Sequence, residues 1–243
     1  MITPRFHVPE AAPGAVVAFP EHWAHHAREV LRLRAGAAVR VFDGAGAEFE
    51  ALLETVTRKE VVARLRGAVA PRPESPLRIT LALAPLKGDL MELAIQKATE
   101  LGVHAVRPVV TFRTDAAARP ALQGSRQERW DKVASGAAAQ CGRAVVPEIA
   151  PTTALAKLLQ EPFPGRKLLF WELPGQRRMK EIEPVAGDVL LLVGPAGGWE
   201  PAEVDQIRAA GFESVALGPR VLRAETAAVA AVAAVQTLWG DLG

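Results

Sequence analysis

The sequence predicts an α/β protein with two parts: a small β-rich N-terminal domain, and a larger domain built on a mostly parallel sheet. Before a proline-rich stretch at Gly67–Pro76, apolar and polar residues alternate over short segments, as they do in half-buried strands. After it, short apolar runs alternate with helical patterns, which is typical of parallel strands covered on both faces. The length of 243 residues and the 49% hydrophobic content allow two unequal cores. We therefore expect domains at residues 1–70 and 78–243, joined by a linker at 71–77.

In the N-terminal domain we expect strands at Val39–Asp43, Glu48–Val56 and Val61–Leu65. The turn Asp43–Gly46 predicts a hairpin, because its glycines can adopt the positive φ angles that tight turns need. One helix is expected at Pro20–Leu33, since proline suits the first turn of a helix. Its apolar face would carry Trp23, Ala27, Val30 and Leu31.

In the larger domain the apolar runs predict strands at Arg78–Ala84, Ala105–Val110, Lys167–Trp171, Val189–Val193 and Ser214–Leu217. The helical patterns predict helices at Asp89–Leu101, Gln127–Cys141, Pro201–Ala210 and Ala224–Leu238. The last of these helices is apolar on nearly all sides. We expect it to be buried, in part against a second subunit.

Charge and cysteine content limit the classes of partner and compartment. Lysine and arginine number 29 against 27 acidic residues, so a polyanion would have to bind to local patches rather than to a global field. No apolar run approaches the roughly 20 residues needed to cross a bilayer, and no secretory signal is visible. The single cysteine, Cys141, allows no internal disulfide, so a cytoplasmic location is expected.

One local basic patch is expected in the N-terminal domain. Arg28 and Arg32 lie four residues apart on the predicted helix, with Arg34 just beyond them and Arg5 near the start of the chain. Such a patch could contact the phosphates of a nucleic acid. A solvated helix face fits the same spacing equally well.

A glycine-rich loop, GPAGGW, follows the apolar run Val189–Val193 directly. Glycines at the carboxyl end of a parallel strand let a ligand approach the main chain closely. The spacing matches neither a dinucleotide fingerprint nor a phosphate-binding P-loop. The helix that follows begins with Glu200, Glu203 and Asp205, whose charges disfavour a phosphate at its N-terminus. We expect a small ligand that is not held by phosphate, although a simple tight turn fits the spacing as well.

A second motif, LGPRVLRAETA at Leu217–Ala227, connects the last predicted strand to the last helix and carries Arg220, Arg223 and Glu225. These charges are either functional or merely solvated. The histidines and Cys141 show no zinc-binding spacing, so no metal is expected. No serine lies in a G-x-S-x-G motif, which argues against a serine hydrolase.

Several stretches, in their order and spacing, resemble the bacterial 16S ribosomal RNA methyltransferases of the RsmE family: HAREVLRLRAG with VFDG, IQKATELGV, AAQCGRAVVPEI, VGPAGGWEPAE and LGPRVLRAETAA. The resemblance covers essentially the whole chain. It implies methylation of N3 of a specific uridine in 16S ribosomal RNA, with S-adenosyl-L-methionine as the cofactor. It also implies a SPOUT fold with a C-terminal trefoil knot, a PUA-like β-barrel over residues 1 to about 70, and a homodimer formed through the SPOUT domain.

The resemblance implies a set of functional residues. Cofactor binding is implied for Trp171, Glu172, Leu173, Gly194, Pro195, Gly197, Gly198, Leu217, Gly218, Leu222, Arg223 and Thr226. As RNA-binding residues we expect Arg5, His26, Arg28, Arg32, Lys87, Arg113 and Arg143. The chain departs from the family pattern at Ala196, Ala224 and Ala139, where the family usually has glutamate, threonine and glutamate.

The expected chemistry is alignment of the uridine N3 with the methyl donor and stabilisation of the deprotonated imide. Arg223 is the first candidate to stabilise the developing charge, with Glu225 orienting it and Arg220 in a structural role. The residues identify no general base. Two alternatives stay open: another SPOUT enzyme acting on tRNA or on a ribose oxygen, and an RNA-binding protein without catalytic activity.

Overall fold

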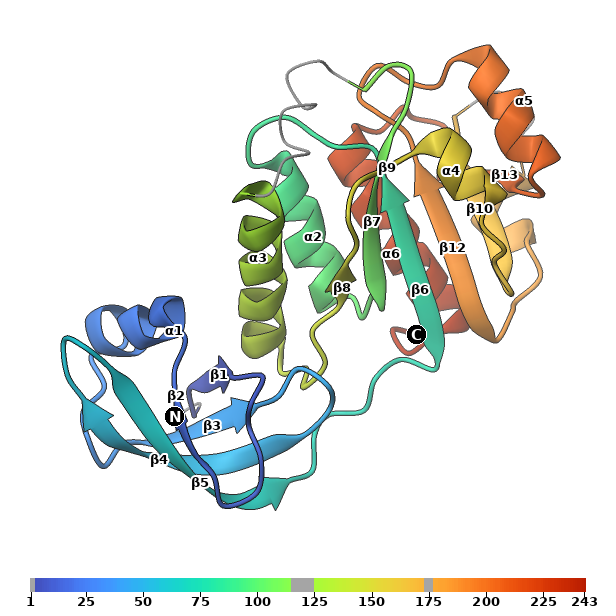
Figure 1. The fold of residues 1–243 in the computed structure, drawn as a ribbon. Helices are drawn as coiled ribbons and strands as arrows, with labels where there is room; N and C mark the ends of the chain where they lie inside the picture. The colour runs from blue at the N-terminus through green and yellow to red at the C-terminus, as the bar shows by residue number, and fades with distance from the viewer. Residues whose placement is uncertain (1–2, 115–124, 173–176) are drawn as a thin grey trace. The chain divides into compact units, whose positions relative to one another are not determined.

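The structure is a computed structural model that describes residues 3–114, 125–172 and 177–243 (Figure 1). The chain divides into two compact units. The first unit combines Met1–Glu74 with Ser135–Val146, and the second combines Ser75–Ala134 with Pro147–Gly243. The inclusion of Ser135–Val146 in the first unit is a feature that the sequence patterns do not predict.

The first unit contains a five-stranded sheet in the order β1-β3-β4-β5-β2. Its strands are β1 (Arg5–His7), β2 (Val16–Ala18), β3 (Ala38–Phe42), β4 (Glu48–Val56) and β5 (Val61–Val69). The pair β1 and β3 is parallel, and the other pairs are antiparallel. Gly44 and Gly46 in the turn between β3 and β4 have φ angles of 80° and 115°, which confirms the predicted hairpin.

The predicted helix at Pro20–Leu33 is wrong in its second half. The structure has α1 (Glu21–His25) followed by a π-helical turn at His26–Val30. The wider turn rotates the later side chains away from the core, so Val30 and Leu31 are 59% and 39% exposed rather than buried. Trp23 and Ala27 are buried as expected.

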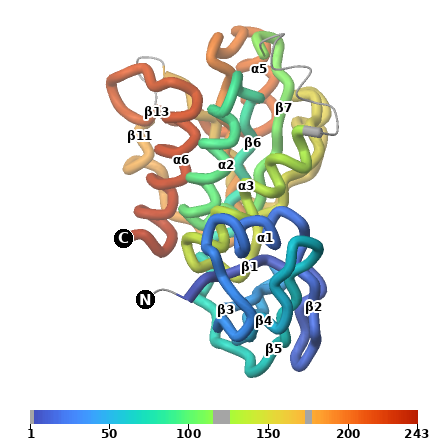
Figure 2. The backbone as a smooth tube through the Cα atoms, turned by 90° about the vertical axis from the view of Figure 1, so that its left-hand side faces the viewer, coloured from blue at the N-terminus to red at the C-terminus, as the bar shows by residue number. Residues whose placement is uncertain are grey.

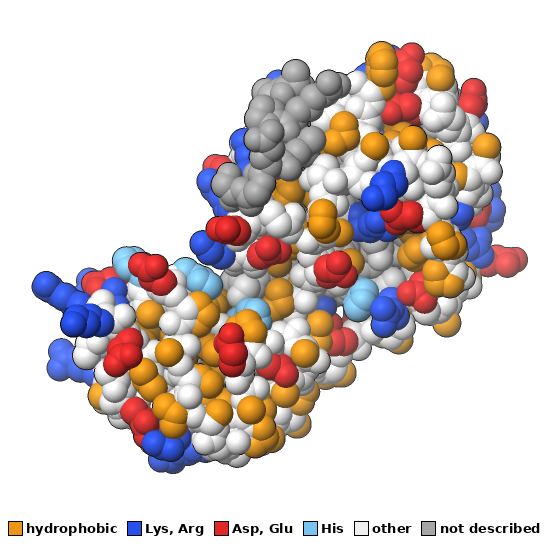
Figure 3. Space-filling view, in the orientation of Figure 1, with side chains coloured by type: hydrophobic (Ala, Val, Ile, Leu, Met, Phe, Trp, Pro, Cys, Tyr) orange, Lys and Arg blue, Asp and Glu red, His pale blue; other side chains and the backbone are white. Residues whose placement is uncertain are grey.

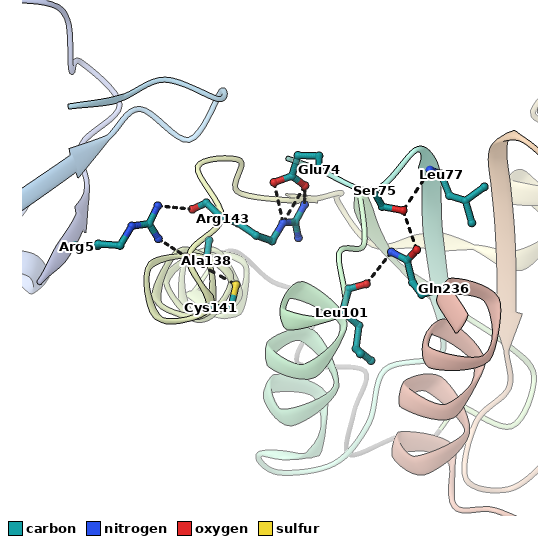
Figure 4. A network of polar contacts seen from close by, with 9 residues as sticks. All are labelled: Arg5, Glu74, Ser75, Leu77, Leu101, Ala138, Cys141, Arg143 and Gln236. Carbon is teal, nitrogen blue, oxygen red and sulfur yellow. Dashed lines mark hydrogen bonds and ion pairs between the residues drawn. The ribbon is translucent and has the colours of Figure 1, made fainter. Parts of the chain in front are cut away.

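The segment Ser135–Val146 closes the core of the first unit. Ala138, Ala139 and Ala144 are buried in one hydrophobic cluster with residues of β1 and β3 such as Phe6 and Phe42. A polar clamp holds the segment in place, as Figure 4 shows. Arg5 donates to both carboxylate oxygens of Glu48 at 2.9 Å, and its Nη1 and Nη2 donate to main-chain carbonyls of Ala138, Ala139 and Arg143. These carbonyls lie at the carboxyl end of a helix, where a cation is favourable.

His7 lies in the same part of the first unit. Its Nε2 is 3.2 Å from the carbonyl oxygen of Asp43, and its Nδ1 is 3.0 Å from Oγ of Ser135. A carbonyl can only accept, so the neutral ring carries its proton on Nε2 and accepts from Ser135 at Nδ1. Burial lowers the pKa of His7 below its usual value of 6.5.

The second unit contains a parallel sheet in the order β11-β13-β10-β12-β6-β7-β8, with β9 pairing to β7. The strands are β6 (Leu77–Leu83), β7 (Ala105–Val110), β8 (Glu148–Ile149), β9 (Thr153–Ala154), β10 (Arg166–Phe170), β11 (Arg177–Arg178), β12 (Gly187–Val193) and β13 (Glu213–Ala216). Leu191 in the centre of β12 pairs with Leu81 on one side and with Leu168 on the other. All five strands predicted for this part of the chain are present.

Helices cover both faces of this sheet. They are α2 (Leu90–Glu100), α4 (Leu155–Gln160), α5 (Pro201–Ala209) and α6 (Ala224–Trp239), with a short 3-10 turn at Met179–Glu181. The helix α3 (Ser125–Cys141) begins in the second unit and ends in the first. On one face α4 and α5 pack in a hydrophobic cluster with Leu190 and Leu192 of β12. On the other, α6 contacts β6 and β12 and lies beside α2 (Figure 2). The predicted α/β class with a mostly parallel sheet is confirmed.

A buried glutamine joins three parts of the second unit (Figure 4). Gln236 of α6 is fully buried, donates to the carbonyl of Leu101 at 2.8 Å and accepts from Oγ of Ser75 at 2.7 Å. A Cβ at Gly102 would lie 2.7 Å from Nε2 of Gln236, so the chain passes close to the amide there. None of the described helices has both the length and the apolar character needed to cross a membrane.

Candidate cofactor pocket

Three loops of the second unit meet at one edge of its sheet. The strands β13, β10 and β12 are neighbours and parallel, so their carboxyl ends lie side by side. Trp171 and Glu172 follow β10, the segment 194–200 follows β12, and the segment 217–223 connects β13 to α6. Open α/β sheets bind ligands at this edge.

A cavity of about 380 Å³ lies among the three loops, within the range of small-molecule sites. Its walls combine glycines, large apolar side chains and a few charged groups. The lining residues are Leu90, Phe170, Trp171, Glu172, Val193, Gly194, Pro195, Ala196, Gly198, Trp199, Val221, Leu222, Arg223, Ala224, Glu225 and Ala227.

Steric crowding by Trp199 explains why position 194 of the glycine-rich loop is a glycine. A Cβ at this position would lie 2.7 Å from Cε2 and 2.8 Å from Nε1 of Trp199, closer than real Cβ contacts allow. Trp199 itself is buried, and its Nε1 donates to the carbonyl of Phe170 at 3.4 Å. Gly198 has a φ of 72° and donates to the carbonyl of Pro195 at 2.9 Å, which closes a turn. The indole of Trp199 thus fills the space left by the missing side chain and forms part of the wall.

The other side of this loop contacts a turn at Thr111–Thr114. Nε and Nη2 of Arg113 lie 3.0 and 2.6 Å from Oε2 of Glu200, and Nη1 donates to the carbonyl of Gly197 at 3.2 Å. Glu203 accepts from the main-chain N–H of Phe112 at 2.7 Å and from that of Glu200 at 3.2 Å. Carboxylates therefore occupy the N-terminus of α5, as the sequence suggested, and leave it unsuited to a phosphate.

The charged groups of the cavity favour a ligand with a positive centre. Among its lining residues, Glu172 and Glu225 are acidic and Arg223 is basic. Two carboxylates near a bound cation such as a sulfonium would stabilise it. No ion pair joins Arg223 to Glu225 in the described part of the chain, so the expected orientation of Arg223 by Glu225 has no direct contact here.

The structure brings most of the predicted cofactor residues together. Seven of them line the cavity: Trp171, Glu172, Gly194, Pro195, Gly198, Leu222 and Arg223. Glu225, predicted as catalytic, lines it as well. Gly197, Leu217, Gly218 and Thr226 belong to the same loops or to the start of α6 but do not line it. Leu173 lies outside the described residues.

Several lining residues carried no signal in the sequence. Leu90 is the first residue of α2 and reaches the cavity from a distant part of the chain, which no local pattern reveals. Phe170 and Val193 are the last residues of their strands and are indistinguishable from core positions in the sequence. Ala196 and Ala224 also line the cavity, so both departures from the family pattern change its wall.

Two of the predicted RNA-binding arginines make structural contacts within the first unit. The side chains of Arg5 and Arg143 are only 10% exposed. Arg5 forms the clamp described above, and Arg143 pairs with the carboxylate of Glu74 at 2.5 Å (Figure 4). Both arginines therefore hold the first unit together.

The remaining basic candidates are more accessible. Arg32 is exposed and has a φ of 53°, a left-handed conformation outside the helix, so it does not share a helical face with Arg28 as expected. Arg28 donates to the carboxylate of Glu29 at 2.7 Å and lowers the pKa of that group. His26 packs edge-on against Trp23, and Lys87 is exposed in the second unit. Figure 3 shows basic side chains gathered at one edge of the first unit, beside histidines.

No cluster of three or more histidine, cysteine or acidic side chains suited to a metal ion occurs among the residues that the structure describes. The donor set of the cavity is that of an organic ligand: main-chain groups of glycine-rich loops, aromatic rings and carboxylates. This set fits a nucleoside carrying a sulfonium, which needs stacking surfaces, hydrogen bonds to ribose and base, and a nearby negative charge.

Comparisons with known proteins agree with this geometry. The family model of the RNA methyltransferase domain matches residues 73–236, and that of the RNA methyltransferase PUA domain matches residues 20–66. The ribosomal RNA small subunit methyltransferase E of Synechocystis sp. is 34% identical over 247 aligned residues, covering 95% of this chain and 76% of that protein.

Two solved structures are similar along the whole chain. The ribosomal RNA small subunit methyltransferase E of Neisseria gonorrhoeae, bound to S-adenosylmethionine, is 36% identical with a TM-score of 0.90 and full coverage of both chains. A methyltransferase of Legionella pneumophila in complex with the same cofactor is 34% identical with a TM-score of 0.94, again over all of both chains. The domain match, the extent of these similarities and the residues of the pocket lead to one conclusion: the chain belongs to the ribosomal RNA small subunit methyltransferase E family.

Proposed function

We propose that this protein methylates N3 of a uridine in 16S ribosomal RNA, with S-adenosylmethionine as the methyl donor. The observation that carries the proposal is the cavity at the carboxyl ends of β10, β12 and β13, lined by glycine-rich loops, two carboxylates and Arg223. Family membership supplies the substrate class, and the two similar structures with the same bound cofactor support the ligand.

The cofactor would be held by main-chain groups of the loops after β10, β12 and β13. Trp171 and Leu222 offer apolar surface for its adenine, and Glu172 and Glu225 offer negative charge for its sulfonium. When bound, S-adenosylmethionine supplies an electrophilic methyl group. Of the cofactor residues outside the cavity wall, Gly197, Leu217, Gly218 and Thr226 would act by shaping the loops. Leu173 remains part of the proposal through the family resemblance.

Arg223 is the proposed catalytic residue. It lines the cavity from the residue that precedes α6, with its side chain exposed and its carbonyl accepting from Ala227 at 2.7 Å. A guanidinium in that position can stabilise the negative charge that develops on a uracil oxygen when N3 loses its proton. Glu225 also lines the cavity and would add negative charge to the site without contacting Arg223. Arg220 is exposed and does not line the cavity.

For RNA we propose contacts by Arg28, Arg32 and His26 in the first unit and Lys87 in the second. The support is their accessibility and the match of a PUA domain to residues 20–66. We take residues 1–70 as the RNA-binding domain, 71–77 as the linker and 78–243 as the methyltransferase domain. The contacts of Arg5 and Arg143 favour a structural role for them over RNA binding.

The finer architecture follows the same resemblance. We propose a C-terminal trefoil knot, a homodimer formed through the SPOUT domain and a cytoplasmic location beside the ribosomal substrate. Exposed apolar side chains on the paired helices α2 and α6, Leu93 and Leu238, support the dimer. The single cysteine supports a reducing compartment.

The decisive experiment is mass spectrometry of nucleosides from 16S ribosomal RNA treated with the protein and S-adenosylmethionine. Bare RNA and assembled small subunits should be compared, each beside a reaction without cofactor. The proposal expects 3-methyluridine at a single position. A methylated ribose, or methylation of tRNA alone, would show instead that the protein has one of the other SPOUT methyltransferase activities. Tight RNA binding without any methylation would favour a non-catalytic RNA-binding protein.

A further inference from the structure

The glycine-rich loop has an attachment on the side that faces away from the cavity. Resting on the proposed function, we infer that Arg113 is a positioning residue for the cofactor loop 194–200. An RNA contact is expected for this arginine from the sequence, whereas among the described residues its side-chain hydrogen bonds go to the loop. The inference is that it fixes the loop in the conformation that receives the cofactor.

The guanidinium of Arg113 is engaged at three nitrogens. Two of them, Nε and Nη2, donate to the same carboxylate oxygen of Glu200, and Nη1 donates to the carbonyl of Gly197. Hydrogen bonds between ionised groups are the stronger kind, and the planar fork of arginine can serve a carboxylate and a carbonyl at once. The ammonium of a lysine is a compact group without this fork. Arg113 is 43% exposed, so each contact alone is modest and the geometry of the set matters.

The segment that presents Arg113 is itself well defined. In the turn Thr111–Thr114, the N–H of Thr111 donates to Oγ1 of Thr114 at 2.8 Å, and the N–H of Thr114 donates to the carbonyl of Thr111 at 3.2 Å. Both threonines are buried. A second connection comes from α5, where the carboxylate of Glu203 accepts from the main-chain N–H of Phe112 in the turn and from that of Glu200 in the loop.

The loop has two sides with different tasks. Gly194, Pro195, Ala196 and Gly198 line the cavity, whereas Gly197 and Glu200 contact Arg113. Glycines give the loop many accessible conformations in the free protein, and ordering them opposes ligand binding. Contacts on the outer side restrict the loop before the ligand arrives. Arg113 therefore acts on cofactor affinity without touching the cofactor.

The test compares Arg113→Ala and Arg113→Lys with a matched control, Arg78→Ala. Arg78 is also an exposed, ion-paired arginine, but its partner Asp188 lies near the start of β12, at the opposite end of the strand from the glycine-rich loop. Calorimetry on the full chain should show the Kd for S-adenosylmethionine raised about fivefold or more by Arg113→Ala, less by Arg113→Lys, and by under about twofold by Arg78→Ala. In turnover assays the change should fall mainly on the KM for the cofactor, with kcat and RNA affinity little altered.

Two further measurements keep the inference testable on its own. Without any ligand, hydrogen exchange of the amides in 194–200 should be faster in Arg113→Ala than in the wild type, a readout that stands even if the cofactor proposal fails. If Arg113→Ala folds poorly, Glu200→Gln removes the charge of the partner at nearly constant shape and should raise the Kd in the same direction. An unchanged Kd together with unchanged exchange overturns the inference. A loss of RNA affinity with an unchanged cofactor Kd overturns it too, and assigns Arg113 to the RNA. A wild-type protein that binds no S-adenosylmethionine but shows the difference in exchange refutes the proposed function alone.

Discussion

Gly194→Ala tests whether the shape of the pocket depends on the contact between a glycine and an indole. The added methyl group would lie 2.7 Å from Cε2 of Trp199 and 3.2 Å from Cδ2. The indole cannot yield easily, because it is buried in a cluster with residues of β10, β12 and α5. Either the ring or the loop has to move.

The size of the effect follows from these two routes. Forcing an extra methyl group into a packed site costs about 1–3 kcal/mol. If the ring moves instead, its hydrogen bond to the carbonyl of Phe170 is lost, at a cost of about 1 kcal/mol. If the loop moves, the cavity wall changes, and the same strain expressed in binding corresponds to a loss of cofactor affinity of roughly 5- to 150-fold.

Gly67→Ala in β5 is the matched control, because Gly67 is exposed and lies outside the cofactor pocket. A Cβ there would have no heavy atom within 4 Å, and its φ is not positive. Calorimetric titration with S-adenosylmethionine and thermal melting should therefore separate the two variants, with Gly194→Ala weaker in binding, lower in melting temperature, or both. If both variants bind and melt alike, the steric account of the loop is refuted.

Four further predictions concern other parts of the chain. Arg223→Ala should retain cofactor binding and lose most turnover; single-turnover methylation at the wild-type rate would remove it from the catalytic role. Replacing Arg28 and Arg32 together by glutamate should weaken binding to ribosomal RNA and reduce the slope of log Kd against log salt concentration by roughly two, and an unaltered slope would count against both. Gln236→Leu should lower the free energy of unfolding by about 1–3 kcal/mol, because it leaves a partly buried carbonyl and a partly buried hydroxyl without their partner. A denaturant titration equal to that of Thr237→Ala, an exposed change on the same helix, would contradict this. The folded protein holds the pKa of His7 below 6.5, so as the pH falls the unfolded chain takes up a proton before the folded one does. The free energy of unfolding should therefore keep its full value above pH 6.5 and decrease below it. His7→Gln should flatten that dependence, and an equally steep curve in the variant would locate the cause elsewhere.

The sequence predicts best where one local pattern decides the structure. The run Val189–Val193 is apolar throughout because both faces of β12 are covered, and the glycines after it have to stand where the strand ends. The hairpin turn at Asp43–Gly46 needs positive φ angles, and the glycines in the sequence indicate this because glycine adopts such angles readily. Such local patterns predict the strands of the second unit and the glycine-rich loop that forms part of the pocket.

Other features depend on contacts between distant residues, and the sequence does not reveal them. The apolar spacing at Pro20–Leu33 suits an α-helix, but the chain widens into a π-helical turn and leaves Val30 outside the core. Arg5 has the residue type of a phosphate ligand, yet it contacts carbonyls more than 130 positions away in the chain. Leu90 enters the pocket only because α2 lies against the same end of the sheet. The charge and periodicity of a local segment do not indicate which distant residues it contacts.

The discontinuous first unit has a consequence for synthesis on the ribosome. Its core includes Ala138, Ala139 and Ala144, which leave the exit tunnel long after the strands they complete. During that interval the early strands can form their hairpins, but one side of their hydrophobic core is missing. Their apolar side chains therefore remain exposed to water and to other nascent chains. A fragment that stops at the linker would remain in that unfinished state, so release of a fully closed N-terminal unit has to wait for the middle of the polypeptide to be translated.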